Sequence, residues 1–174
     1  SNTTIGDGVK FINNIAKSHG GAIYLSDYNK SVLNFTIKDN VLFEGNSSGY
    51  HGGAIYTYFY DNNSQLKIGD NAKFANNSTT KNGGAVYSAG NVSIVDNAKF
   101  INNAATSPTK GMGGAIYIAK AGFNIGQGSE FISNSAIQGG AIFNSANTEL
   151  TIDKATFINN SAKGSQAIGG AIAL

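Results

Sequence analysis

The stretch Gly20-Gly21-Ala22-Ile23-Tyr24 decides the fold, because close copies of it return five more times along the chain. The glycine pairs of the six copies are Gly20 and Gly21, Gly52 and Gly53, Gly83 and Gly84, Gly113 and Gly114, Gly139 and Gly140, and Gly169 and Gly170. A second motif, Phe-x-x-Asn, precedes every copy. Its residues are Phe11 and Asn14, Phe43 and Asn46, Phe74 and Asn77, Phe100 and Asn103, Phe131 and Asn134, and Phe157 and Asn160. Two motifs that alternate strictly along the chain indicate an internal structural repeat.

Each repeat reads as three short extended segments. The first is the Gly-Gly-Ala-Ile-Tyr stretch, the second is an apolar-x-Ile triplet such as Leu66-Lys67-Ile68, and the third ends on the Phe, as in Ala72-Lys73-Phe74. Alternation of apolar and polar residues predicts strands, and no stretch shows a helical period. The sequence therefore predicts an all-β, right-handed parallel β-helix of about six coils with three strands each, which forms a single domain over residues 1–174.

Polar residues mark the expected corners between strands. A polar side chain stands four residues before each Phe, at Asp7, Asp39, Asp70, Asp96, Gln127 and Asp153. The residues that follow are Gly8, Asn40, Asn71, Asn97, Gly128 and Lys154. All but the lysine are types that tolerate a positive φ, which a sharp corner demands. We also expect the Asn of each Phe-x-x-Asn motif to lie at a corner, where stacked amides can form a ladder.

The composition argues against several functional classes. The net charge is only +2 and charged residues make up 13% of the chain, which is too little to attract nucleic acid or membranes by bulk electrostatics. All 12 basic residues are lysines, so the planar fork that arginine offers to phosphates and bases is missing. The chain has no cysteine, which excludes disulfides and thiolate metal sites.

The alternation of Gly-Gly-Ala-Ile with Phe-x-x-Asn resembles the repeats of the polymorphic outer-membrane proteins of chlamydiae. It is also similar to repeats in large adhesin-like surface proteins of bacteria and archaea. The resemblance covers essentially all 174 residues. It implies the passenger β-helix of an autotransporter, exported through a C-terminal membrane barrel and displayed at the cell surface as an adhesin. The chain departs from many members of that family in having no cysteine.

An aromatic column is expected next to the isoleucines of the repeated Ile-Tyr pairs. If Ile23 and its equivalents point inward, alternation directs the following aromatic residues outward and stacks them. These residues are Tyr24, Tyr56, Tyr87, Tyr117 and Phe143. The column either stiffens the sheet beneath covering loops or presents a binding face with apolar area and polar hydroxyls. The sequence leaves both interpretations open.

Aromatic residues are also concentrated in the first two coils. Six of the 8 Tyr residues fall within the first 60 positions, and the two longest loops, 25–34 and 57–65, contribute several of them. Loops raised on a rigid scaffold often carry recognition, so we predict a surface for a ligand or partner here and along the column. Its candidate residues are Tyr24, Tyr28, Tyr50, Tyr56, Tyr58, Phe59, Tyr60, Tyr87 and Tyr117. The alternative is that the loops pack back over the side of the helix.

Two sets of residues could suggest a metal site or catalytic carboxylates, but we interpret both as structural. His19 and His51 both precede a glycine pair and should stack in adjacent coils, where two imidazoles could bind a metal. The later coils have Asn82, Met112, Gln138 and Ile168 at that position. The Asp column could be compared with the carboxylates of polysaccharide-cleaving β-helix enzymes, but turn formation explains each Asp. We therefore predict no catalytic residues, no metal site and no cofactor.

The sequence thus predicts an extracellular, cell-surface β-helix of the adhesin type and not an enzyme. A structural fibre or stalk is the alternative, and a polysaccharide-active enzyme is a third. The expected partner is a protein or glycan on a host cell or a neighbouring cell, with no nucleic acid. The first and last residues match the two sides of an internal junction between coils, so copies of the chain could stack end to end through the open sheet ends. Alternatively, the segment is a piece of a longer surface protein and further β-helix flanks it. Membrane contact is expected only through an anchor outside this segment.

Overall fold

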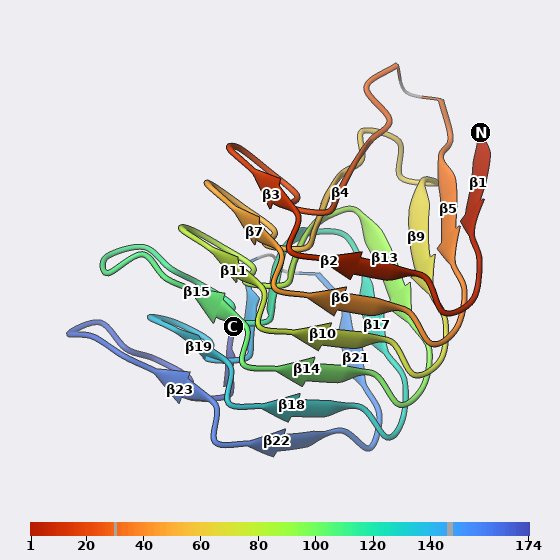
Figure 1. Ribbon diagram of the computed structural model, residues 1–174. Helices are drawn as coiled ribbons and strands as arrows, with labels where there is room; N and C mark the ends of the chain where they lie inside the picture. Colours follow the sequence, from red (N-terminus) through yellow and green to blue (C-terminus); the bar gives the residue numbers. More distant parts are fainter. Residues whose placement is uncertain (30, 146–147) are drawn as a thin grey trace.

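The computed structural model is an all-β solenoid whose chain winds through four parallel sheets (Figure 1). It describes residues 1–29, 31–145 and 148–174. Each sheet contains 6 strands, and the strands of consecutive coils lie side by side. The parallel β-helix that the two motifs predict is therefore confirmed.

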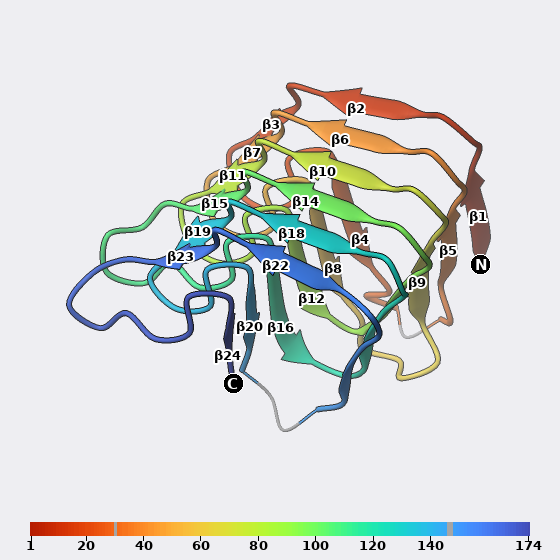
Figure 2. The ribbon, with the colours of Figure 1, turned by 90° about the horizontal axis from the view of Figure 1, so that it is seen from below.

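The first two sheets form adjoining sides of the solenoid (Figures 1 and 2). The first sheet contains β1 (Asn2–Ile5), β5 (Asn34–Ile37), β9 (Gln65–Ile68), β13 (Asn91–Ile94), β17 (Phe123–Ile125) and β21 (Leu150–Ile152). The second sheet contains β2 (Lys10–Ile12), β6 (Leu42–Glu44), β10 (Lys73–Ala75), β14 (Lys99–Ile101), β18 (Glu130–Ile132) and β22 (Thr156–Ile158). Equivalent residues of the repeats pair directly, as Phe74 does with Phe43 and Phe100.

The other two sheets complete each coil. The third sheet contains β3 (Ile15–Ala16), β7 (Ser47–Ser48), β11 (Ser78–Thr79), β15 (Ala104–Ala105), β19 (Ser135–Ala136) and β23 (Ser161–Ala162). The fourth sheet contains β4 (Ile23–Ser26), β8 (Ile55–Tyr58), β12 (Val86–Ala89), β16 (Ile116–Lys120), β20 (Ile142–Asn144) and β24 (Ile172–Ala173). The fourth sheet carries the Ile-Tyr part of the repeated pentapeptide.

Each coil has four strands where the sequence predicts three. The additional strand is the two-residue element of the third sheet, such as β11, which pairs with β7 and β15. It forms because the residue before the motif Asn turns the chain with a positive φ, which is 55° at Asn76. The strand itself varies from Ile15-Ala16 to Ser78-Thr79, so no alternation of apolar and polar residues reveals it in the sequence.

The interior of the solenoid is filled by a stack of phenylalanine rings. The motif phenylalanines of neighbouring coils have ring centroids 4.7–4.8 Å apart and planes within 7° of parallel. Phe43, Phe74, Phe100 and Phe131 are fully buried, with the isoleucines of the first and fourth sheets packed around them. Burial of each such ring contributes about 1.5–3 kcal/mol to stability, so the stack is a substantial part of the hydrophobic core.

The motif asparagines form the amide ladder expected from the sequence. The Asn77 side-chain amide Nδ2 donates to Oδ1 of Asn103 at 3.0 Å and to the carbonyl oxygen of Phe43 at 3.0 Å. The backbone N–H of Asn77 donates to the same Oδ1 of Asn103 at 3.0 Å. Equivalent amide bonds run from Asn14 to Asn46, from Asn46 to Asn77, from Asn103 to Asn134 and from Asn134 to Asn160. Because these buried amides find partners in the adjacent coils, the ladder locks one coil onto the next.

The two glycines of each pair serve different purposes. Gly83 adopts a φ of 72°, the left-handed region that other residues enter at a cost. Gly84 lies against the next coil, and a Cβ there would come within 1.9 Å of the carbonyl oxygen of Gly114. The repeat therefore needs glycine first for its backbone conformation and then for close approach of two coils.

In the other pairs, too, the first glycine supplies the backbone conformation and the second allows close approach, with one exception in the last coil. A positive φ recurs at the first glycines, Gly20, Gly52, Gly113, Gly139 and Gly169. A Cβ would come within 2.1 Å of a carbonyl oxygen of the next coil at the second glycines Gly21, Gly53, Gly114 and Gly140. At Gly170 an added Cβ would lie 3.6 Å from its nearest neighbour, the carbonyl oxygen of Asn160 in the same coil. That distance is an ordinary contact, so the second glycine is not required for close approach at this position.

Loops of different length leave this regular frame. The connections from β4 to β5 and from β8 to β9 rise beyond the sheets at the N-terminal end (Figure 1). They correspond to the two long loops expected from the sequence, although Lys30 lies outside the described residues. The loops that follow β15 and β23 extend from the third sheet (Figure 2). Among the described residues no helix has the length and hydrophobicity to cross a membrane.

Candidate functional site

The aromatic column forms on the outer face of the fourth sheet. It consists of Tyr24, Tyr56, Tyr87, Tyr117 and Phe143. Neighbouring rings have centroids 4.9–5.6 Å apart and planes within 16° of parallel. The stacking predicted for these five side chains is therefore present.

The stacking determines which part of each ring meets solvent. In a near-parallel stack the ring faces cover one another, so the interior members present edges and hydroxyl groups. Tyr56 is only 8% exposed, whereas Tyr24 at the end of the column is 56% exposed. Burial, followed by the neighbouring Tyr117 and Tyr58, raises the pKa of Tyr87 to about 12, so its hydroxyl stays neutral. The geometry suits the stiffening interpretation, while binding through the column stays a prediction of the sequence.

A different arrangement occurs in the two N-terminal loops. Tyr28, Tyr58 and Tyr60, termed the tyrosine cluster below, meet edge to face. The Tyr28 and Tyr60 rings lie 5.7 Å apart at 82°, and the Tyr58 and Tyr60 rings lie 5.0 Å apart at 60°. Tyr28 is 79% exposed and Tyr60 is 43% exposed. Because Tyr28 and Tyr60 are exposed, parts of both rings are open to solvent.

A buried carboxylate ties the two loops of the cluster together. Asp27 is 5% exposed and lies beside Tyr28 in the first loop. Its oxygens accept hydrogen bonds from the second loop, namely from the backbone N–H groups of Tyr60 and Asp61 and from Oγ of Ser64. Burial raises the pKa of Asp27, but these hydrogen bonds outweigh it and leave the pKa below its usual value. Asp27 is therefore a charged anchor that sets the position of the second loop.

Phe59 supplies an apolar anchor for the same loop. The sequence places it among the binding candidates, but its side chain is 1% exposed and belongs to the core. A Cβ on Gly90 would come within 2.3 Å of the Phe59 ring, so the glycine of the next coil makes room for it. Phe59 N–H also donates to the carbonyl oxygen of Ala89 at 2.9 Å. Its contribution is to hold Tyr58 and Tyr60 in place rather than to contact a ligand.

The histidines stack as the sequence predicts. The rings of His19 and His51 lie 5.3 Å apart with planes 1° from parallel, and His51 continues to Asn82 in the next coil. Tyr50 packs edge-on against both rings. The ammonium group of Lys81 lies over the Tyr50 ring, 4.1 Å from the ring centroid. Tyr50 thus belongs to this histidine group and not to the tyrosine cluster.

The electrostatics of this pair favour neutral imidazoles. Burial lowers the pKa of His51 to about 4, with smaller effects from His19 and Lys81. Burial and Lys81 also lower the pKa of His19. The Nδ1 atoms of both rings are buried without a hydrogen-bond partner in the described part of the chain. Within residues 1–29, 31–145 and 148–174, no three His, Asp or Glu side chains gather into a group that could hold a metal ion.

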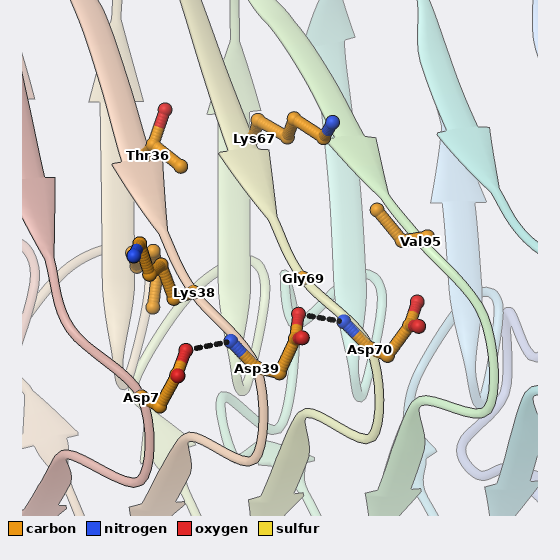
Figure 3. A pocket seen from close by; sticks show the side chains of 9 residues that line it. Asp7, Thr36, Lys38, Asp39, Lys67, Gly69, Asp70 and Val95 are labelled. Atoms are coloured by element: carbon orange, nitrogen blue, oxygen red, sulfur yellow. Dashed lines mark hydrogen bonds between the residues drawn. The ribbon is translucent and has the colours of Figure 1, made fainter.

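Three of the corner aspartates, Asp7, Asp39 and Asp70, line a hollow of about 410 Å³ beside the ends of the first-sheet strands (Figure 3). Oδ1 of Asp7 accepts the backbone N–H of Asp39 at 3.2 Å, and Oδ1 of Asp39 accepts that of Asp70 at 2.9 Å. Figure 3 shows these bonds running from coil to coil, with Lys38 and Lys67 nearby. The sequence explains each Asp by turn formation at its own corner, whereas here the carboxylates of Asp7, Asp39, Asp70 and Asp96 accept hydrogen bonds from the backbone of the next coil. This is a structural use of the carboxylates.

Sequence reasoning misses a column of amide side chains at the start of the first-sheet strands. Asn34 Nδ2 donates to Oδ1 of Asn2 at 3.1 Å, and Gln65 Nε2 donates to Oδ1 of Asn34 at 3.3 Å. Asn91 occupies the next position and donates from Nδ2 to the carbonyl oxygen of Asn62 at 2.7 Å. The recurrence of an amide directly before the apolar-x-Ile triplet is a signal that could have revealed this column.

A comparison with known proteins adds the family. The model of the Chlamydia polymorphic membrane protein (Chlamydia_PMP) repeat matches residues 8–26, 40–58 and 71–89. Each matched stretch runs from a corner through the second and third sheets to the end of the strand that carries a column tyrosine. No curated protein and no solved structure matches the chain. Three stretches of the first three coils thus match the repeat of the Chlamydia polymorphic membrane protein family, in agreement with the resemblance carried by the two alternating motifs.

Proposed function

We propose that this repeat protein is an adhesin-type β-helix of the cell surface that attaches to a protein or glycan on another cell. The tyrosine cluster is the proposed contact surface. The β-helix acts as a rigid support, because the phenylalanine stack and the asparagine ladder connect every coil to the next. No covalent chemistry is involved in this proposal.

One observation carries the proposal. The tyrosine cluster exposes large aromatic side chains on the two loops that connect the fourth sheet to the first sheet in the N-terminal coils. The carboxylate of Asp27 and the buried ring of Phe59 hold the second of these loops, which carries Tyr60, to the frame. Exposed rings on a preorganised loop lose little conformational entropy on binding, which favours recognition.

A stalk remains the second candidate function, because a specific observation favours it. All four sheets run through the whole stack of coils, so the molecule resists bending along its length. In that case the repeats would hold another domain away from the surface, and the tyrosine cluster would have no partner.

An attachment assay separates the two candidates. Beads coated with the protein are counted after washing over layers of animal cells and of bacterial cells. The adhesin proposal expects retention that falls at least tenfold when Tyr28 and Tyr60 are both replaced by serine. Ile15→Ser and Ile158→Ser form the matched control, since these side chains are 80% and 42% exposed and lie outside the loops. Failure of the unmodified protein to attach, or equal retention of the double tyrosine variant, would reject the proposal.

A further inference from the structure

We infer that the tyrosine cluster and the neighbouring amide column, Asn2, Asn34, Gln65 and Asn91, together form a binding site for a neutral glycan. This inference rests on the proposed attachment function and names the class of ligand. The cluster offers open aromatic faces, and the column offers neutral hydrogen-bonding groups next to them. The loops connect the two parts, because the same two loops that carry the tyrosines lead directly into Asn34 and Gln65.

The aromatic part matches one side of a sugar ring. A pyranose presents a face of C–H groups that packs against an aromatic face, and it cannot make this contact with ring edges. Tyr28 and Tyr60 meet at 82° and are both exposed, so a ring face is available. The aromatic column, whose rings cover one another, lacks such faces along most of its length.

The amide part matches the rim of a sugar ring. Every hydroxyl of a sugar both donates and accepts a hydrogen bond, and a side-chain amide does the same with its N–H₂ and its carbonyl. Within the column Asn34 uses one N–H and one acceptor position, and Gln65 uses one N–H. Further positions on these amides therefore stay available to a ligand.

A shallow hollow marks where a sugar ring fits. It has a volume of about 180 Å³ and lies beside Gln65, Asn91, Ser93, Gly122 and Asn124. Its polar side chains are neutral amides and one hydroxyl. The bond from Asn91 to the carbonyl oxygen of Asn62 connects the hollow to the second loop. The hollow and the tyrosine cluster thus lie at the two ends of that loop.

The charges of the cluster argue for a neutral ligand over an acidic one. Asp27 is buried and accepts three hydrogen bonds from its own protein, and Asp61 accepts from the backbone and side chain of Asn63. The Lys120 ammonium lies over the Tyr58 ring, 5.6 Å from its centroid. These charges are engaged within the fold, and burial and the neighbouring Tyr58 and Tyr28 raise the pKa of Tyr60, so its hydroxyl is neutral.

The test measures binding of neutral tetrasaccharides of β1,4-linked and α1,4-linked glucose, with sialyllactose as the acidic comparison. Calorimetry gives affinities, and tyrosine fluorescence reports directly because the chain has no tryptophan. We expect a neutral tetrasaccharide to bind, and Tyr60→Ser and Gln65→Ala each to weaken it about tenfold, which corresponds to about 1.4 kcal/mol. Ile158→Ser, matched to Tyr60 in exposure, should bind as the unmodified protein does.

Three results would overturn the inference. They are no binding of either neutral tetrasaccharide, equal binding by the Tyr60 and Gln65 variants, and tighter binding of sialyllactose that depends on Lys120. Attachment to cells whose surface sugars have been oxidised and ring-opened by periodate distinguishes this failure from failure of the proposed function. Attachment that persists on oxidised cells rejects the glycan and keeps the adhesin, whereas no attachment to untreated cells rejects the adhesin itself.

Discussion

The asparagine ladder and the tyrosine cluster differ in almost every physical respect. The ladder repeats one hydrogen-bond pattern from Asn14 to Asn160, is buried over its middle coils and is built by the shared motif. The cluster lies at the N-terminal coils, exposes Tyr28 and Tyr60, and has no counterpart among the described residues of the later coils. The shared part of the sequence therefore maintains the fold, whereas recognition is expected where the sequence departs from the repeat.

The largest expected effect comes from breaking the ladder. Asn103→Ala should destabilise the protein by about 3–5 kcal/mol, since it removes the acceptor of the buried Asn77 backbone N–H, one of the two acceptors of Asn77 Nδ2, and the amide donor to the carbonyl oxygen of Phe74. Chemical denaturation followed by circular dichroism measures this. Asn124→Ala, at an exposed position, is the control and should change stability by less than about 0.5 kcal/mol. Similar losses for both variants would mean that the ladder has no special role.

A smaller effect is expected at the anchor of the cluster. Asp27→Asn places an amide N–H₂ where three donors need an acceptor, so we expect the free energy of unfolding to fall by about 1–3 kcal/mol. The resulting disorder should be confined to the two loops. Amide hydrogen exchange should accelerate at Tyr60 and Asp61 but not in β10 or β14. Exchange that rises evenly across all coils would show that the loops are not a separate unit.

The lowered pKa of Asp27 also determines how the stability of the fold changes with pH. Because the folded pKa lies below the unfolded value of 3.8, the carboxylate stabilises the fold above that value. This contribution is lost as the pH falls through the folded pKa. The Asp27→Asn variant should lack this acid-dependent loss.

The histidine pair predicts a pH dependence at milder acidity. Unfolded His51 takes up its proton near pH 6.5 and folded His51 only at about 4, so the unfolded state binds more protons between these values. The contribution of His51 to stability should therefore fall as the pH drops through this window and change no further below it. His51→Asn, which copies Asn82 of the next coil, should flatten the profile. An unchanged slope in this variant would exclude His51 as the cause.

The smallest effect on stability is expected within the cluster itself. Tyr28→Ser should change the free energy of unfolding by less than about 0.5 kcal/mol, because this ring is 79% exposed. Thermal unfolding beside Ile15→Ser, with 80% exposure, provides the comparison. A loss above about 2 kcal/mol would show that the ring serves the fold and not recognition.

The sequence predicts the periodic part of this structure well and the aperiodic part poorly. The stacking of Phe74 on Phe100 and the amide ladder follow from residue types that recur at one position. The two-residue strands of the third sheet escape prediction because their side chains vary. Phe59 could not be recognised as buried, since its fit depends on Gly90, which lies in another coil. The role of Asp27 likewise depends on contacts across more than 30 residues.

The central claim is that attachment depends on the tyrosine cluster and not on the aromatic column. A comparison of attachment by variants of the two tests this claim most directly. Beads carrying the double variant Tyr28→Ser with Tyr60→Ser are compared with beads carrying Tyr117→Leu, which changes the aromatic column instead. We predict that the cluster variant loses attachment at least tenfold while the column variant retains it, with both proteins folded by circular dichroism. Loss of attachment by the column variant alone would contradict the account and place recognition on the repeated face of the fourth sheet.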